Sequence, residues 1–265
     1  MDQPVLSPQL KQMIANHLPR NIRRFQYHIY ADVPALSRLG IYIDPRPFEG
    51  KVVARTKEFI VVREARTRFA LLTRKWLTVD PPDGSQVEVI PYARRNFEGR
   101  RIDEPKEEKH ILGDQVFITR SVVLGGNEIH LPLPEVQCPE LKSLIECLEK
   151  LPAPDRFRRI SHLLVDACAR DFSVVDPAPD DIIRTPPAVT CSVETSKFTG
   201  QLSIVYERGL DLYAIELRHN SELYQRIDQV YFDDLGARLE ELIDDGAWRQ
   251  IRVRILSLPK QLLRH

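Results

Sequence analysis

Hydrophobic residues between positions 48 and 101 occur in short runs, separated by charged segments or by segments rich in Pro and Gly. The runs lie at 50–54, 58–62, 68–72 and 86–90. Runs of this length that are rich in Val, Ile, Leu and Phe are typical of β-strands. Several short strands joined by regularly spaced turns favour a small closed β structure. We therefore expect residues 46–102 to form a small basic β-barrel.

The hydrophobic period becomes helical farther along the chain. Between residues 139 and 151, apolar side chains recur at i, i+3, i+4 and i+7, which predicts an amphipathic helix. After a Pro-Ala-Pro break, we expect Asp155 to cap a second, antiparallel helix with Arg158 on its outward face. Upstream, Gly125-Gly126 separates two apolar segments and predicts a tight hairpin turn. Residues 111–175 are thus expected to contain a β-hairpin and a helix pair.

A proline-rich segment at 176–187 predicts a linker between domains. The residues after it, 188–265, are expected to fold alone as an α+β domain with two layers. Before the barrel, residues 1–45 are expected to be helical or extended. The predicted fold class is therefore α+β: a small basic β-barrel plus a helical hairpin, with a C-terminal α+β two-layer unit.

The end of the sequence alternates apolar and basic residues. Ile251, Val253 and Ile255 occupy every second position, with Arg252 and Arg254 between them. Alternation with a period of two predicts a strand that is buried on one face. We expect its apolar face to pack on the helix of the C-terminal domain, whose N-terminus Asp233 or Asp234 would cap. Its basic face would then meet solvent or a ligand.

Composition indicates a folded protein, with 43% hydrophobic and 29% charged residues. No apolar run reaches the length of a membrane span, and the first residues do not resemble an export signal, so we expect a cytoplasmic protein. The cysteines are scattered, without a C-x-x-C pair or a matching histidine spacing, which favours reduced thiols over a metal site. We expect no cofactor. The cysteines are Cys138, Cys147, Cys168 and Cys191.

The formal net charge of zero hides two regions of opposite sign. Twelve Lys/Arg and six Asp/Glu lie between Lys51 and Arg101. Eight acids and only two basic residues lie between positions 222 and 245. Charge segregation of this kind affects which partners a protein attracts and does not determine its fold.

The sequence lacks the common catalytic signatures. It has no G-x-x-x-x-G-K-S/T phosphate loop, no H-E-x-x-H and no G-x-S-x-G. A weak nuclease interpretation uses Asp211, Glu216 and Arg218 as an altered metal-binding motif. Arg218 stands where that motif usually has lysine, and arginine cannot relay a proton. We therefore expect a protein that is not an enzyme, with no catalytic residue.

The predicted barrel carries a family resemblance. Its opening, Phe-Glu-Gly-Lys-Val-Val at 48–53, and its close, Pro-Asp-Gly-Ser-Gln-Val-Glu-Val at 82–89, are similar to the KfrB-like domain of plasmid-borne proteins. Some proteins of this kind are fused to conjugative relaxases. The resemblance implies a protein of a plasmid, phage or integrative element that acts around DNA maintenance or transfer. It implies no catalytic residue.

The leading hypothesis is a nonenzymatic nucleic-acid-associated protein of a mobile genetic element. Arginine and lysine bind phosphates, and exposed aromatic rings stack on bases. Exposure of Phe59, Phe69, Trp76 and Tyr92 would therefore distinguish a stacking surface from a protein core. The proposed nucleic-acid-binding residues are Arg55, Lys57, Arg63, Arg66, Arg68, Arg74, Lys75 and Trp76.

The alternative hypothesis is a protein-interaction module or inhibitor. Acids concentrated at 222–245 could imitate a phosphate track and dock on a basic, DNA-binding protein. Neither hypothesis fixes the oligomeric state. The proposed partner-binding residues are Asp233, Asp234, Glu240, Glu241, Asp244 and Asp245.

Overall fold

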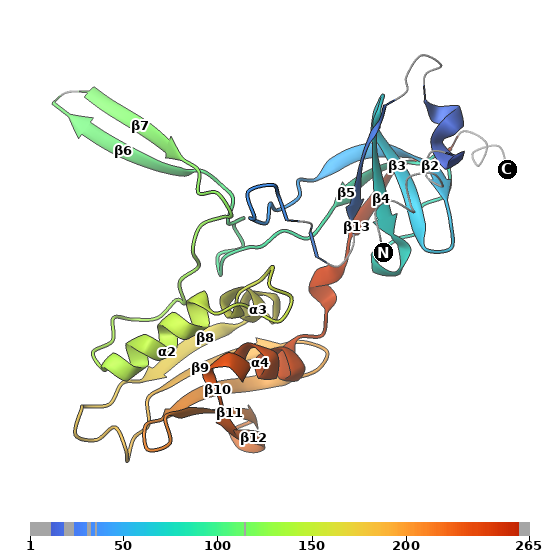
Figure 1. The fold of residues 1–265 in the computed structure, drawn as a ribbon. Coiled ribbons are helices and arrows are strands. Elements are labelled where there is room, and N and C mark those ends of the chain that lie inside the picture. Colours follow the sequence, from blue (N-terminus) through green and yellow to red (C-terminus); the bar gives the residue numbers. More distant parts are fainter. Residues whose placement is uncertain (1–11, 19–23, 31–32, 35, 114, 260–265) are drawn as a thin grey trace. The chain divides into compact units, whose positions relative to one another are not determined.

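The structure is a computed structural model, and it describes residues 12–18, 24–30, 33–34, 36–113 and 115–259 (Figure 1). The fold is mixed α+β, with more strand than helix. The chain divides into two compact units, which we describe separately. Unit 1 is Met1–Ala35, Asp44–Ala93 and Trp248–His265, and unit 2 is Leu36–Ile43 and Arg94–Ala247. Much of the expected N-terminal segment, including its first residues, lies outside the described residues.

In its described residues, unit 1 is built on a six-stranded sheet with the order β1-β4-β3-β2-β5-β13. β1 runs parallel to β4, and the other neighbouring pairs are antiparallel. Short 3-10 helices, η1 (Ala15–His17) and η2 (Arg74–Trp76), accompany the sheet. The strands are β1 (Gln26–Tyr30), β2 (Phe48–Arg55), β3 (Phe59–Ala65), β4 (Arg68–Thr73), β5 (Gln86–Ile90) and β13 (Arg252–Ser257).

Both faces of this sheet carry apolar clusters. Ile60 and Val62 belong to one cluster, and Val61 between them belongs to the other. Alternating side chains of a strand point to opposite faces, so a strand covered on both faces reads as a continuous apolar run. The rings of Tyr30 on β1 and Phe48 on β2 lie 5.3 Å apart, although two strands separate β1 from β2 in the sheet. The sheet therefore curls around the cluster that contains Ile60 and Val62.

The segment after η2 makes a further backbone connection within unit 1. Leu77 forms an isolated parallel bridge with Ile251, just before β13. The N–H of Ile251 donates to the Trp76 carbonyl at 2.7 Å, and the N–H of Thr78 donates to the Ile251 carbonyl at 3.1 Å. Within the described residues, no ladder joins β1 to β13. The predicted small barrel is therefore not found as a closed sheet.

The location of β13 corrects the predicted C-terminal domain. The strand pairs with β5, with Val253 opposite Val89, instead of packing on the helix after residue 234. Its predicted alternation is confirmed, because Val253 is buried while Arg252 and Arg254 are exposed. The apolar face of β13 completes the cluster formed by Val87 and Val89. The period of two revealed which face of this strand is buried, but it did not reveal which sheet the strand joins.

Unit 2 contains a five-stranded antiparallel sheet with the order β12-β11-β10-β9-β8. Three helices lie on one face of this sheet (Figure 1), and their apolar residues share a core with it. The helices are α2 (Pro139–Lys150), α3 (Ile160–Asp166) and α4 (Leu235–Ile243). The strands are β8 (Arg170–Val175), β9 (Ala188–Glu194), β10 (Thr199–Glu207), β11 (Leu212–His219) and β12 (Glu222–Val230). A further 3-10 helix of unit 2 is η3 (Phe232–Asp234), whereas η4 (Ala247–Arg249) spans the point in the sequence where unit 2 ends and the last segment of unit 1 begins.

The expected linker at 176–187 is a loop inside unit 2. β8 before it pairs with β9 after it, with Val174 opposite Val189. The carboxylate of Asp176 accepts hydrogen bonds from the N–H groups of Gln137 and Cys138, both at 2.8 Å. The helices expected in a separate region supply the core of the sheet after the loop. Residues 188–265 therefore do not form the separate domain that the prolines suggested.

The hairpin of unit 2 also differs from its prediction. β6 (Lys106–Leu112) pairs with β7 (Gln115–Ser121) in a two-stranded sheet. The turn at Gly125-Gly126 lies after this hairpin, where the N–H of Gly126 donates to the Val123 carbonyl at 3.0 Å. A Cβ on Gly126 would lie 2.4 Å from Ile102 Cδ1, so glycine is needed for this close approach. Charged residues hid β6, because they interrupt the apolar pattern of a strand.

The second predicted helix begins later than expected. Asp155 Oδ1 accepts hydrogen bonds from the N–H groups of Phe157 and Arg158 at 2.8 and 2.7 Å, but α3 begins only at Ile160. Arg158, expected on the outward face, is completely buried. Among the described residues, no helix combines the length and apolar character needed to cross a membrane.

Candidate charged surfaces and a buried ionic cluster

The two units carry opposite net charges. Unit 1 has 18 Lys/Arg and nine Asp/Glu in its sequence, a formal net charge of +9. Unit 2 has 20 Lys/Arg and 29 Asp/Glu, a formal net charge of −9. The arginines at 94, 95, 100 and 101 belong to unit 2, whereas the basic residues after position 248 belong to unit 1. Positive and negative charges are therefore separated more completely between the two units than between the predicted domains.

The predicted nucleic-acid-binding residues lie in two groups at opposite ends of β3. The first group surrounds the β2–β3 turn, where Arg74 Nη1 donates to the Thr56 carbonyl at 3.0 Å. Asp80 and Asp83 neutralise much of this group: Arg55 contacts Asp83 at 2.7 Å and Asp80 at 3.6 Å, and Arg74 binds Asp80. This group consists of Arg55, Lys57, Arg74, Lys75 and Trp76.

The second group lies near the β3–β4 turn and consists of Arg63, Arg66 and Arg68. Arg68 Nε pairs with Glu64 at 2.8 Å. Among the described residues, Arg63 and Arg66 have no ion-pair partner, and Lys57 of the first group has none either. The structure thus does not join the eight predicted residues into one surface. It leaves three of their cations available to external anions.

The outer face of the sheet extends the second group. Lys51 lies directly opposite Arg63, and residues opposite each other in a ladder project from the same face. Arg252 and Arg254 of β13 share this face, with Arg254 bound to Glu88 at 2.8 Å. Lys51 and Arg252 are exposed, and within the described part of the chain neither forms an ion pair. Lys51 was not among the candidate residues that the sequence indicated.

The four aromatic residues chosen as a test of base stacking lie within or against protein cores. Phe69 is fully buried, and Phe59 and Trp76 are partly buried against the two apolar clusters. The rings of Tyr92 and Trp248 are 5.0 Å apart. Lys75 Nζ lies 4.5 Å from the centre of the Trp76 ring. These rings therefore serve packing, and the basic surface offers charge without an aromatic platform from this set.

The predicted acidic residues of unit 2 separate into exposed and structural groups. Asp233 and Asp234 are exposed, and among the described residues they have no ion-pair partner. Asp234 occupies the N-cap of α4 but makes no side-chain cap hydrogen bond. Glu241 pairs with Arg238 at 3.1 Å. Glu240 uses its carbonyl to accept from Lys197 Nζ at 3.2 Å.

Asp245 is held by neighbouring donors. It accepts hydrogen bonds from the Ser196 N–H at 2.9 Å, the Ser196 hydroxyl at 3.0 Å and the Ala247 N–H at 2.9 Å. Burial alone would raise the pKa of Asp245, but these hydrogen bonds outweigh it and lower the pKa overall. Asp245 thus shapes the chain after α4, and an external partner would compete with those donors.

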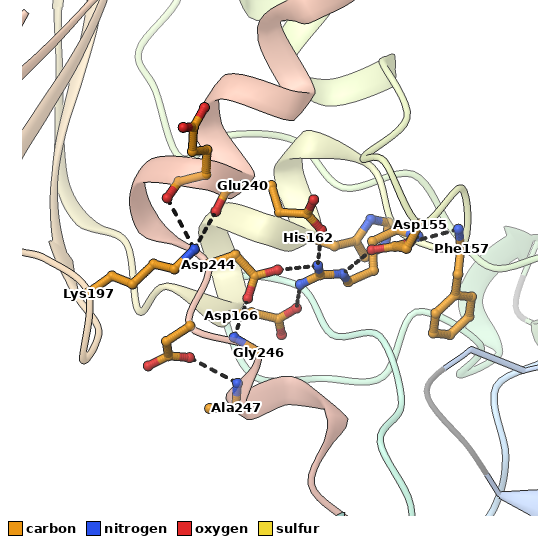
Figure 2. A network of polar contacts seen from close by, with 12 residues as sticks. Asp155, Phe157, His162, Asp166, Lys197, Glu240, Asp244, Gly246 and Ala247 are labelled. Carbon is orange, nitrogen blue, oxygen red and sulfur yellow. Dashed lines mark hydrogen bonds and ion pairs between the residues drawn. The ribbon is translucent and has the colours of Figure 1, made fainter.

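The most buried charge of unit 2 is Arg158. Its Nε contacts Asp155 at 2.8 Å, its Nη1 contacts Asp166 at 2.8 Å, and its Nη2 binds Asp244 (Figure 2). Glu240 lies farther away, with Oε1 3.8 Å from Nη2. Burial would lower the pKa of Arg158, but the attraction of Asp166 and Asp244 outweighs it and raises the pKa. We call these five residues the Arg158 cluster.

The Arg158 cluster joins three segments of unit 2. Asp155 precedes α3, Asp166 ends it, and Asp244 directly follows α4. Asp244 Oδ1 also accepts from the Gly246 N–H at 2.8 Å. Removing one partner from a buried ion pair leaves an uncompensated charge and is strongly destabilising. The cluster therefore fixes the ends of α3 and α4. The local Asp155-x-x-Arg158 spacing was visible in the sequence, but the distant Asp244 was not.

His162 lies beside this cluster and is also buried. Its Nδ1 accepts the backbone N–H of Arg159 at 2.9 Å, and Nε2 has no hydrogen-bond partner among the described residues. Burial, reinforced by the positive charges of Arg94 and Arg159, lowers the pKa of His162 to about 3. The imidazole is therefore neutral at physiological pH.

The residues of the weak nuclease interpretation have separate partners. Asp211 accepts from the Tyr206 hydroxyl at 2.6 Å, whereas Glu216 binds Arg218 at 2.7 Å and also Arg226. Among the described residues, no group of three or more His, Cys, Asp or Glu is arranged to hold a metal ion. The carboxylates of Asp211 and Glu216 are thus engaged by neighbouring side chains of unit 2.

No protein-family model, curated protein or solved structure matches the chain. The resemblance of residues 48–101 to the KfrB-like domain therefore stays a prediction.

Proposed function

We propose that the protein associates with nucleic acid without catalysis, through phosphate contacts made by unit 1. The observation that carries this proposal is the net charge of +9 on unit 1, in a chain whose total charge is zero. Phosphate contacts supply most of the sequence-independent affinity of proteins for DNA. The outer face of the sheet offers Lys51, Arg63 and Arg252, and Arg66 lies at the adjoining turn.

None of the four aromatic residues is fully exposed, which favours contact with the nucleic-acid backbone. A surface that stacks single-stranded bases needs exposed rings, whereas Phe69 has no exposed area. Cations without stacking partners suit the regularly spaced phosphates of a duplex. We therefore expect duplex DNA to bind at least as tightly as single-stranded DNA of equal length.

The same proposal includes the origin and the finer fold of unit 1. The resemblance at 48–101 supports a role in the DNA maintenance or transfer of a mobile genetic element. The Leu77–Ile251 bridge and the curled sheet support a barrel-like fold. Small β-barrels often bind nucleic acids on their outer surfaces.

Fluorescence anisotropy with labelled duplex and single-stranded DNA tests the proposal. If about four phosphates are neutralised, the logarithm of the duplex association constant should fall against log salt concentration with a slope of roughly −3.6. The double variant Arg63→Glu and Arg66→Glu should weaken binding by tenfold or more. The matched control is Arg184→Glu with Lys142→Glu, which reverses two exposed charges of unit 2 and should leave the affinity unchanged.

Absence of binding to either DNA at low salt would refute the proposal. Equal losses in both double variants would show only a dependence on total charge and would also refute the assignment to unit 1. Far-ultraviolet circular dichroism and thermal unfolding of both variants ensure that a loss of binding is not a loss of fold.

A second candidate function is docking of unit 2 on a basic, DNA-binding protein. It is favoured by Asp233 and Asp234, which are exposed beside the exposed side chains of Tyr231 and Phe232. A histone can serve as the basic probe in a binding assay. We expect binding that duplex DNA competes away and that Asp233→Lys with Asp234→Lys abolishes. Retained binding in this variant would contradict the docking assignment.

A further inference from the structure

The β6–β7 hairpin concentrates exposed apolar side chains. Of the 21 exposed large hydrophobic residues in the described part of the chain, eight lie between positions 111 and 124, each 46–77% exposed. Every described residue of β6 and β7 is exposed, so neither face of the hairpin is covered. The eight residues are Ile111, Leu112, Val116, Phe117, Ile118, Val122, Val123 and Leu124.

Such a hairpin is unfavourable when nothing packs against it. A two-stranded hairpin is at best marginally stable in water, and contiguous exposed apolar residues mark interaction surfaces. The strands are nevertheless regular, with seven residue pairs in continuous register from Lys106–Ser121 to Leu112–Gln115 (Figure 1). The hairpin therefore has two regular strands that a further strand can extend into a larger sheet.

The two edges of the hairpin differ in charge. β6 begins Lys106-Glu107-Glu108-Lys109, and charged side chains on an edge strand discourage pairing with another strand. β7 carries one charged residue, Arg120, whose Nε binds Glu107 at 2.7 Å. Within the described residues, β7 has no second ladder partner. The edge open to a further strand is therefore that of β7.

The sequence of β7 is complementary to itself when two copies run antiparallel about Phe117. In that register, Phe117 lies opposite Phe117 of a second copy, Val116 lies opposite Ile118, and Gln115 lies opposite Thr119. Aromatic, β-branched and polar residues then each meet a partner of their own kind, and such cross-strand pairs stabilise sheets. A symmetric dimer uses the same patch on both chains, which this register satisfies.

We propose that the occupant of the β7 edge is a second copy of this chain, which joins the two hairpins into a four-stranded sheet of order β6-β7-β7-β6 about a two-fold axis at Phe117. Ile111, Val116 and Ile118 of both copies then form one continuous apolar cluster on one face of the sheet. The inference concerns self-association and does not depend on nucleic-acid binding.

Disulfide trapping tests the register in the full-length chain. In a Cys168→Ser background, which removes the exposed native thiol, Phe117→Cys should give a covalent dimer on mild oxidation. Directly opposite residues have Cα atoms about 4.5–5.5 Å apart, within the range of a disulfide. The control is Lys109→Cys on β6. Its two copies would be three strand spacings apart, about 14 Å, and should not be linked.

Sedimentation analysis tests the association itself. The unmodified protein should show a concentration-dependent dimer at micromolar concentrations, and Phe117→Lys should weaken the dimer at least tenfold by placing two like charges opposite each other. His110→Lys is the matched control, because His110 pairs with Phe117 within the hairpin but lies on β6. We expect it to dimerise nearly as well as the unmodified protein.

A protein that stays monomeric, or a Phe117→Lys variant that dimerises normally, would overturn the proposal. So would equal disulfide yields at positions 109 and 117, which would indicate random collision. A dimer that forms without trapping at Phe117→Cys would place the interface elsewhere and would equally reject the register.

Discussion

Units 1 and 2 are both built on antiparallel sheets, yet they stabilise those sheets differently. Unit 1 curls its sheet around an apolar cluster and takes its edge strand β13 from a distant part of the sequence. Unit 2 covers one face of a sheet meander with helices and buries an arginine among carboxylates. In unit 1, apolar packing across distant segments dominates, whereas unit 2 also depends on buried ionic contacts. The two units should therefore respond differently to mutation and pH.

The largest expected effect comes from the Arg158 cluster. Arg158→Ala leaves the buried carboxylates of Asp155 and Asp244 without their cation, and it should destabilise unit 2 by about 3–5 kcal/mol. Chemical denaturation followed by hydrogen exchange would measure the loss unit by unit. Arg159→Ala, which removes a half-exposed partner of Glu128 at 3.5 Å, should cost less than about 1 kcal/mol. Comparable losses in both variants would contradict the role of the cluster.

The next effect should appear in unit 1. Ile251 is 2% exposed, directly precedes β13 and belongs to the apolar cluster that contains Ile60 and Val62. Ile251→Ala should therefore destabilise unit 1 by about 3 kcal/mol. Hydrogen exchange should accelerate in β5 and leave β9 to β11 protected. Leu258→Ala, at an exposed position, is the control. Faster exchange in the strands of unit 2 instead would restore the original prediction that the C-terminal strand belongs there.

A smaller effect is expected from His162 on mild acidification. The pKa of His162 is about 3 in the folded protein, against a reference value of 6.5 for the unfolded chain. As the pH decreases below 6.5, the unfolded chain therefore takes up a proton that the folded protein does not bind, and the stability of the folded protein falls. Between pH 6.5 and pH 5 the loss should be about 2 kcal/mol. His162→Gln should flatten this part of the curve for unit 2, measured by urea denaturation across pH. An unchanged slope would mean that other groups control it.

The local pattern predicted elements better than it predicted their neighbours. The helical period at Leu141, Leu144 and Leu148 gave α2, and the apolar runs gave β2 to β5. The prolines at 176–187 were misleading, because proline ends a strand without ending a domain. β13 shows the same limit: alternation reveals a buried face, but the choice between two possible apolar partners depends on the folded arrangement.

Charge in the sequence identified candidate binding residues, but it did not show which of them are available to an external partner. Arg55 and Asp244 carry the expected charge, but each forms an ion pair with a neighbour in its own unit. Arg63 is partly exposed and Asp233 is exposed, and neither forms an ion pair within the described residues. The distinction depends on tertiary contacts: Arg55 meets Asp83 across a turn, and Asp244 meets Arg158 from a distant segment. Lys51 was missed because a lone lysine in a strand gives no signal until Arg63 lies opposite it.

The position of β13 has a consequence for synthesis on the ribosome. Residues 91–251 are translated between β5 and β13, so the sheet of unit 1 stays without its edge strand while the whole of α2 to α4 emerges. At about 5–20 residues per second, this interval lasts roughly 10–30 s. Unit 2 is mostly continuous in sequence and can fold during that time. A nascent chain therefore presents the unpaired edge of β5 to other chains and to chaperones until β13 arrives.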